Sequence, residues 1–194
     1  MTTTDHSAGW EAVSDQFIAI RSQVGTALVR GWAKDRLPQS AAILDVGCGS
    51  GVPIAQALVA DGFSLWGVDA SPSLISAYRQ NLPGMPAVCE PAQDSSFFNR
   101  TFMGVVSVGL IFLLGADDQR KLLTSVARVL EPEGRFLFSA PREVCRWNDT
   151  LTGRASMSLG VDAYSAHLTS MGLRLDDCRS DEGGNNYYEA VKLI

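Results

Sequence analysis

The sequence predicts an α/β fold in which a mostly parallel sheet carries helices on both of its faces. Short apolar runs at residues 41–46, 64–69 and 102–114 alternate with stretches of helical spacing, which is the pattern of parallel strands joined by crossover helices. The first run passes directly into three glycines at alternate positions, residues 47, 49 and 51, and an acidic residue, Asp69, ends the second run. A bare turn after one strand and an acid at the tip of the next are typical of a nucleotide-binding edge.

Length, composition and charge limit the classes of function. A chain of 194 residues with 46% hydrophobic and 19% charged residues has the composition of an ordinary globular protein, and we expect a single domain over residues 1–194. The net charge of −5, without any basic stretch, argues against a nucleic-acid partner and favours a small or neutral molecule.

Cysteine and histidine usage predicts neither a disulfide framework nor a metal site. The four cysteines are widely spaced, no C-x-x-C motif occurs, and the histidines are His6 and His167. No signal peptide is evident, and the longest uncharged run, residues 104–116, is too short to span a bilayer. We therefore expect a cytoplasmic protein without a membrane partner.

Segments of helical spacing precede the first strand. Residues 1–9 show no periodicity, and we expect them to be disordered. Val13, Phe17 and Ile20 mark one helical face, and apolar residues between Val24 and Trp32 mark another. Residues 10–37 are therefore expected to form two N-terminal cap helices or one bent helix.

The glycine segment after the first strand is suited to binding a ligand. Without Cβ atoms the backbone can adopt positive φ and approach a bound molecule closely, and the N–H groups of the following helix point toward it. Asp45 interrupts a strand that is otherwise apolar, and a buried carboxylate needs a partner, so Asp45 is a candidate ligand or loop anchor. The third glycine comes one residue earlier than in the G-x-G-x-x-G pattern of dinucleotide sites, which disfavours a nicotinamide-dependent oxidoreductase.

The segment D-V-G-C-G-S-G, residues 45–51, resembles the first motif of the class I S-adenosylmethionine-dependent methyltransferases. The resemblance implies a Rossmann-like, seven-stranded, mostly parallel sheet with an antiparallel last strand. It also implies S-adenosyl-L-methionine as the cofactor and a small-molecule methyl acceptor. The cofactor loop would then contain Asp45, Gly47, Cys48, Gly49 and Gly51. The N-terminal helices would cover the cofactor, which makes Arg21 a candidate contact for the methionine carboxylate.

The second strand ends at the acid that we expect to hold the ribose. Asp69 lies 18 residues beyond the last glycine of the loop, and a carboxylate can accept hydrogen bonds from both ribose hydroxyls. Ser71 and Pro72 supply the N-cap and first residue of the next helix, which leaves Asp69 free. Asp69, Ala70 and Ser71 are therefore candidate cofactor residues.

The third strand, residues 87–89, leads into a candidate adenine contact. By the resemblance, an acid after this strand accepts a hydrogen bond from the adenine amino group, and Glu90 matches that position best, with Asp94 as the rival. Pro91 departs from the usual acid-alanine pair because it has no N–H to donate, whereas Ala92 retains one.

The apolar run from residue 102 to residue 114 predicts a central strand that is buried on both faces, with Ser107 and Gly109 at its end beneath the cofactor. Many relatives carry an aspartate where this chain has Met103. Residues 131–141 resemble the family's turn into the fifth strand, with Glu133 in place of its first glycine.

The last part of the chain is expected to wall the acceptor pocket. Residues 142–160 are irregular and polar, and the segment is too long for a simple connector. A helix at residues 161–171 precedes two strands joined by the loop 181–186, and the resemblance places the final strand, antiparallel, between its neighbours.

Methyl transfer from a sulfonium is an in-line displacement in which the protein aligns the partners and excludes water. A base assists when the acceptor is a neutral O–H, S–H or N–H group. Candidate catalytic residues are Glu182, Asp149 and His167, with Asp181 as a further carboxylate. The alternative function is a non-catalytic module that binds the cofactor and acts as a partner or regulatory subunit. We expect a monomer or a homodimer.

Overall fold

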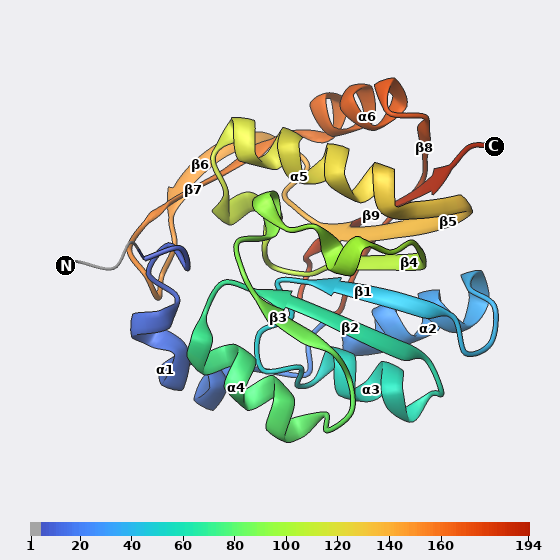
Figure 1. Cartoon of the computed structure of the whole chain (residues 1–194). Helices are drawn as coiled ribbons and strands as arrows, with labels where there is room; N and C mark the ends of the chain where they lie inside the picture. The colour runs from blue at the N-terminus through green and yellow to red at the C-terminus, as the bar shows by residue number, and fades with distance from the viewer. Residues whose placement is uncertain (1–4) are drawn as a thin grey trace.

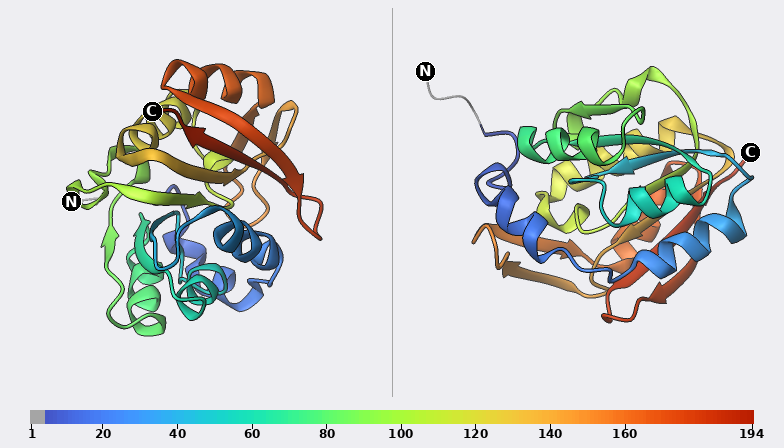
Figure 2. Two further views of the ribbon diagram at one scale, coloured as in Figure 1. Left: turned by 90° about the vertical axis from the view of Figure 1, so that its right-hand side faces the viewer. Right: turned by 90° about the horizontal axis from the view of Figure 1, so that it is seen from below.

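The computed structural model describes residues 5–194, in which a seven-stranded sheet lies between two groups of helices (Figure 1, Figure 2). Strands β1 to β5 pair in parallel, whereas β9 is antiparallel to both β5 and β8. The predicted fold class, including the antiparallel last strand, is thereby confirmed. Across the sheet the strands run in the order β3 (Ala87–Cys89), β2 (Ser64–Asp69), β1 (Ala42–Val46), β4 (Phe102–Ser107), β5 (Leu130–Ser139), β9 (Asn186–Lys192) and β8 (Leu173–Ser180).

Helices cover both faces because successive residues of a strand point to opposite sides of the sheet. In β1, Ile43 packs with one helical layer while Leu44 and Val46 pack with the other, and all three side chains are fully buried. In the part of the chain that the structure describes, no helix is long and apolar enough to cross a bilayer. The first layer contains α2 (Thr26–Arg36), α3 (Ile54–Ala60) and α4 (Pro72–Asn81), and the second contains α5 (Ala116–Val129) and α6 (Val161–Ser170).

The N-terminal part begins with turns and a short helix. A 3₁₀ turn, η1 (Glu11–Val13), leads into α1 (Ser14–Ile20), and α2 follows after a short linker. Asp5 accepts hydrogen bonds from the backbone N–H groups of Ser7 at 3.0 Å and Gly9 at 2.7 Å. These bonds fold residues 5–9 into turns, so the expectation of disorder for residues 1–9 is wrong for this part. Residues 1–4 lie outside the described residues.

The central strand covers only the first part of the apolar run at residues 102–114, and it ends at Ser107, as predicted. β4 ends at Ser107, and the chain then turns at Gly109, whose φ of +80° lies in the left-handed region. The rest of the run forms the 3₁₀ turn η4 (Ile111–Leu113). Hydrophobicity alone did not distinguish this turn from a strand, because the side chains of both pack against the same core.

A two-stranded hairpin occupies the segment that we expected to be irregular. β6 (Val144–Asn148) pairs antiparallel with β7 (Ala155–Leu159), outside the main sheet. The buried amide of Gln119 holds the hairpin, because its Nε2 donates to the carbonyl oxygens of Leu114 at 2.9 Å and Met157 at 3.0 Å. The Tyr164 hydroxyl donates to Gln119 Oε1 at 2.8 Å. This network fixes the hairpin relative to the segment after β4.

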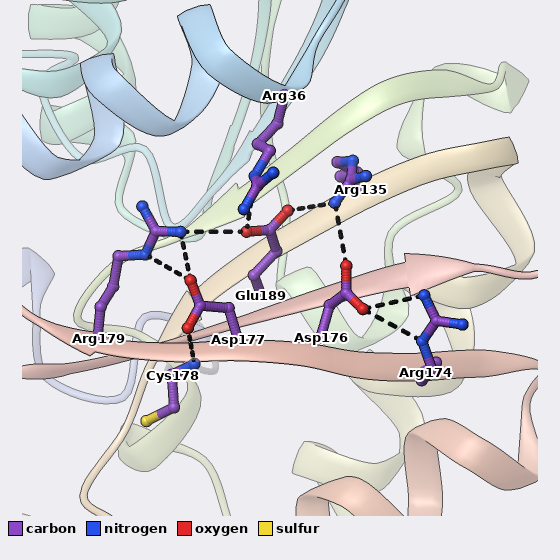
Figure 3. Close-up of polar contacts among 8 residues, drawn as sticks. All are labelled: Arg36, Arg135, Arg174, Asp176, Asp177, Cys178, Arg179 and Glu189. Carbon is purple, nitrogen blue, oxygen red and sulfur yellow. Dashed lines mark hydrogen bonds and ion pairs between the residues drawn. The ribbon is translucent and has the colours of Figure 1, made fainter.

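A charged cluster ties the antiparallel strands to α2 (Figure 3). The Glu189 side chain on β9 is 1% exposed, and its carboxylate pairs with Arg135 of β5, Arg36 of α2 at 3.4 Å and Arg179 of β8 at 3.6 Å. Three cations thus surround one buried anion, and they come from three different elements. Removing one partner of a buried ion pair destabilises the fold, because the remaining charges lose their partner without regaining full hydration.

Removing this anion should destabilise the fold. We predict that Glu189→Ala lowers the free energy of unfolding by about 3–5 kcal/mol. The matched control is Asp117→Ala, since the Asp117 side chain is 101% exposed and pairs only with the neighbouring Arg120 in the same helix. That control should leave stability nearly unchanged. Urea denaturation measures both variants, and equal stabilities for the two would contradict the role given to Glu189.

Candidate functional site

A cavity of about 300 Å³ lies at the carboxyl ends of β1, β2 and β4, where an open parallel sheet places its ligand. The glycine loop, the tip of β2 and the segments after β3 and β4 form its floor and sides, and the N-terminal part of the chain closes it. Its polar and aromatic lining residues are His6, Ser7, Trp10, Phe17, Arg21, Asp45, Cys48, Asp69, Gln93 and Asp118.

The glycine loop, residues 47–51, is held against β2 by its own backbone. The N–H groups of Gly47 and Cys48 donate to the carbonyl oxygen of Val68 at 2.8 and 3.1 Å. Gly51 has a φ of +78°, and a Cβ added there would lie 2.8 Å from the Leu82 side chain and 2.9 Å from the ring of Tyr78. Both the backbone conformation and the space therefore require glycine at this position.

Asp69 joins the glycine loop to the tip of β2. Its Oδ2 accepts from the Gly49 N–H at 3.0 Å and its Oδ1 from the Ser71 N–H at 2.9 Å. Burial raises the pKa of this carboxyl, and the hydrogen bonds from Ser71 and Gly49 oppose that shift. Each oxygen keeps a further lone pair, and the side chain lines the cavity, so Asp69 is a fixed acceptor for two hydroxyl groups of a ligand.

Asp45 and Arg21 place opposite charges at one end of the cavity. Asp45 is 5% exposed, and no hydrogen bond to it occurs within residues 5–194. Burial raises its pKa to about 7, against the opposing effect of the Arg21 charge. Arg21 also lines the cavity, where its guanidinium carbon lies 5.8 Å from the centre of the Phe17 ring. A cation next to an unpartnered carboxylate is suited to a zwitterionic group.

Apolar side chains line further parts of the cavity. Ala70 follows β2, Pro91 and Ala92 follow β3, and Leu110 and Leu113 follow β4. Gln93, which follows Ala92, adds an amide that can donate and accept hydrogen bonds. Together these groups are suited to a flat, partly polar ring.

The N-terminal strap, residues 5–11, is fastened at both of its ends. At one end, the Glu11 carboxylate accepts hydrogen bonds from the hydroxyl of Ser71 and from the N–H of Ser73 at 3.1 Å. At the other end, Asp5 lies 3.3 Å from Arg154 in the turn of the β6–β7 hairpin. Figure 1 shows this segment between α4 and the hairpin. The strap therefore covers part of the cavity, to whose lining His6, Ser7 and Trp10 contribute.

The structure brings most of the predicted cofactor residues to one cavity. These are Arg21, Asp45, Gly47, Cys48, Gly49, Gly51, Asp69, Ala70, Pro91, Ala92 and Gly109.

Three predicted cofactor residues do not line the cavity. The Ser71 hydroxyl is used as the N-cap of α4, where it accepts from the Leu74 N–H at 3.2 Å. The Glu90 carboxylate accepts from the hydroxyl of Ser95 instead of facing the cavity, and Gln93 takes its place in the lining. Ser107 is fully buried, and its hydroxyl has no hydrogen-bond partner among the described residues.

The three predicted catalytic residues also lie outside the cavity. Glu182 accepts from the Gly25 N–H at 3.2 Å, and Asp149 accepts from the N–H groups of Leu151 and Thr152 at 3.1 and 2.7 Å within the hairpin turn. His167 lies on α6 with its Nε2 3.0 Å from the carbonyl oxygen of Arg120 on α5. Asp149 thus bonds within its own turn, whereas Glu182 and His167 bond to the backbone of other elements.

Sequence reasoning missed the lining that comes from the strap and from η4. His6, Ser7 and Trp10 belong to a stretch without periodicity, so no pattern pointed to them. Phe17 was predicted to lie on a helical face, but the sequence could not show that this face meets the glycine loop. A Cβ added at Gly49 would lie 3.2 Å from the Phe17 ring.

The sheet order, the glycine loop and the acid at the tip of β2 define a class of protein, the class I methyltransferase fold. The chain resembles the class I S-adenosylmethionine-dependent methyltransferases, and a family model described as "Methyltransferase domain" matches residues 43–134, just under half of the chain. The match includes the glycine loop, Asp69 and the strands β1 to β4.

Individual relatives are more distant. The chain is 33% identical over 112 residues to the putative methyltransferase YqeM of Bacillus subtilis, which covers 55% of this chain and 45% of the relative. It is 38% identical over 78 residues to the 18S rRNA (guanine-N(7))-methyltransferase bud23 of Schizosaccharomyces pombe, which covers 39% of this chain and 29% of the relative. The chain thus spans less than half of the length of these curated relatives.

Solved structures share the fold. SAM-bound CalS10, an amino pentose methyltransferase from Micromonospora echinaspora, matches with a TM-score of 0.71 and 17% identity, over 90% of this chain and 93% of that chain. At this level of identity the likeness concerns the arrangement of the strands and helices.

The buried carboxyl of Asp45 should cost stability at neutral pH. Its folded-state pKa of about 7 exceeds the value of about 3.9 in an unfolded chain, so the cost grows from about pH 4 and is complete above about pH 7. We predict that Asp45→Asn raises the free energy of unfolding by up to about 4 kcal/mol at pH 8 and changes it little at pH 4. Urea denaturation at the two pH values measures this, with Asp15→Asn on the exposed side of α1 as the control. If the wild-type chain were as stable as Asp45→Asn at pH 8, the raised pKa of Asp45 would be contradicted.

Proposed function

We propose that this chain binds S-adenosyl-L-methionine in the cavity and transfers its methyl group to a small-molecule acceptor by in-line displacement. The observation that carries the proposal is the set of groups that line one cavity. They are a pair of opposite charges, Asp45 and Arg21, a fixed carboxylate, Asp69, at the tip of β2, and apolar residues that follow β2, β3 and β4. The cofactor presents an amino acid, a ribose and an adenine, which match these three kinds of group.

Each part of the cavity has a distinct task in this proposal. Arg21 binds the methionine carboxylate and Asp45 binds the amino group, which gives the buried Asp45 the partner that the chain itself lacks. Asp69 accepts from both ribose hydroxyls, and the Gly49 and Ser71 N–H groups already orient it. Ala70, Ala92 and Leu113 enclose the adenine ring.

The bound cofactor supplies a methyl group that its positive sulfur has already activated. The chain therefore has to align an acceptor with that methyl group and keep water away from it. The strap supports exclusion of water, because Glu11 and Asp5 fasten it over the cavity from two sides.

A small acceptor is favoured over a macromolecule by charge and by enclosure. The net charge of −5 opposes binding of a polyanion, and the strap, residues 5–11, covers part of the cavity. CalS10, with the same fold, is an amino pentose methyltransferase, whereas bud23 is an rRNA methyltransferase. We further propose that the protein works in the cytoplasm as a monomer or homodimer.

Loss of the ribose contact tests the cofactor assignment. We predict that Asp69→Ala weakens binding of S-adenosylhomocysteine by about 1–3 kcal/mol, or roughly 5- to 150-fold, because the ribose hydroxyls lose their acceptor. Isothermal titration calorimetry measures the affinity. Asp94→Ala is the matched control, since Asp94 pairs with Lys121 and does not line the cavity. Unchanged affinity in Asp69→Ala, or no heat with the wild-type chain at millimolar nucleoside, would contradict the proposal.

Turnover is tested separately by release of S-adenosylhomocysteine over a panel of small acceptors. Release above the rate without acceptor would support methyl transfer. Binding of the nucleoside without any turnover would instead favour a non-catalytic binding module.

A further inference from the structure

The reacting end of the cavity needs a group that can take a proton, and the residues predicted for this task lie elsewhere. The titratable side chains that do line the cavity are His6, Arg21, Asp45, Cys48, Asp69 and Asp118. These side chains differ in whether they can accept a proton and in whether they already have another task in the site. Arg21 is a permanent cation, and burial raises the pKa of the Cys48 thiol well above its usual value, so neither group accepts a proton.

Of the remaining groups, His6 is the one imidazole in the lining, and it has no other task in the proposed site. Asp45 and Asp69 are assigned to the amino group and the ribose of the cofactor. Asp118 is a carboxylate on the first turn of α5, and it is exposed, as His6 is. An imidazole, in contrast, exchanges its proton in the physiological range, which is where general-base catalysis is most efficient.

The strap holds His6 in place from both sides along the chain. The preceding residue, Asp5, accepts hydrogen bonds from Ser7 and Gly9 and pairs with Arg154 at 3.3 Å, so a closed turn surrounds His6. On the other side, Ser7 Oγ accepts from the Glu11 N–H at 2.9 Å, and Glu11 is itself bound to the first turn of α4. His6 therefore sits on a fastened segment and not on a free tail.

We propose, on the basis of the proposed function, that His6 is the general base that takes the proton of the methyl acceptor. The acceptor atom forms a bond to the methyl carbon, the carbon–sulfur bond breaks, and its electron pair remains on sulfur as a neutral thioether. The proton leaves the acceptor for an imidazole nitrogen of His6. The acceptor class is therefore one with a removable proton, such as a hydroxyl, a thiol or a protonated amine.

The charges around His6 make this placement measurable without turnover. Asp5 and Arg154 flank it along the strap and the hairpin, and Arg21, Asp45, Asp69 and Asp118 line the same cavity. S-Adenosylmethionine and S-adenosylhomocysteine differ by the methyl group and by one positive charge, on sulfur. A sulfonium close to His6 disfavours the imidazolium form, so the two nucleosides should affect His6 differently.

Proton NMR of the histidine C2–H resonances tests the placement. The chain has only two histidines, so His6→Asn assigns both signals. We predict that the midpoint of the His6 titration lies measurably lower with S-adenosylmethionine than with S-adenosylhomocysteine, because the sulfonium charge disfavours the imidazolium form. His167, which lies between α5 and α6 away from the cavity, is the internal control and should respond equally to both.

Kinetics test the role. With any acceptor that turns over, His6→Asn should lower kcat by roughly 10²- to 10⁴-fold and abolish the acidic limb of the pH profile, while leaving the affinity for S-adenosylhomocysteine unchanged. His167→Asn is the matched substitution and should retain the wild-type profile. Rapid turnover with an unchanged pH profile in His6→Asn would overturn the proposal. An identical His6 midpoint with the two bound nucleosides would overturn it too, whereas failure of either nucleoside to bind would first overturn the cofactor assignment.

Discussion

The carboxylate of Asp69 connects the two parts of the sheet edge on which the site depends. Its oxygens accept from the N–H groups of Gly49 and Ser71, so one side chain sets the distance between the loop after β1 and the tip of β2. The glycine loop is also bound to β2 directly, because its N–H groups donate to the carbonyl oxygen of Val68. The hydroxyl of Ser71 donates to Glu11 and so binds the strap to the start of α4. The glycine loop, the tip of β2 and the strap are thus joined through Asp69 and Ser71.

The site is maintained at a cost in stability that the rest of the fold offsets. Asp45 is buried without a hydrogen-bond partner in the described chain, and Gly47, Gly49 and Gly51 adopt positive φ, which restricts the loop to a conformation that other residues rarely adopt. In the β5–β9–β8 part of the sheet, by contrast, the buried Glu189 is surrounded by three arginines. The carboxylate of Asp45 in the cavity thus lacks a partner, whereas the carboxylate of Glu189 in the structural part of the sheet is ion-paired.

The sequence predicted those features that short-range pattern determines. Parallel strands, the glycine loop and Asp69 follow from apolar runs and from residue spacing, and the structure has them as expected. The β6–β7 hairpin was missed because it lies outside the main sheet and the buried positions of β7 are serines, Ser156 and Ser158, instead of apolar residues. The sequence could not show that Glu90 bonds to Ser95, because the direction of a side chain after a strand depends on the following turn, here the 3₁₀ turn at residues 92–94. Asp149, Glu182 and His167 are plausible bases by chemistry, but each makes a hydrogen bond that sequence does not reveal.

The most direct measurement of the central claim is a crystal structure of the chain with S-adenosylhomocysteine. The account predicts both ribose hydroxyls within hydrogen-bond distance of Asp69, the amino acid between Asp45 and Arg21, and the adenine in the slot formed by Ala70, Ala92 and Leu113. A nucleoside bound elsewhere, or one whose ribose leaves the Asp69 carboxylate without a contact, would contradict it.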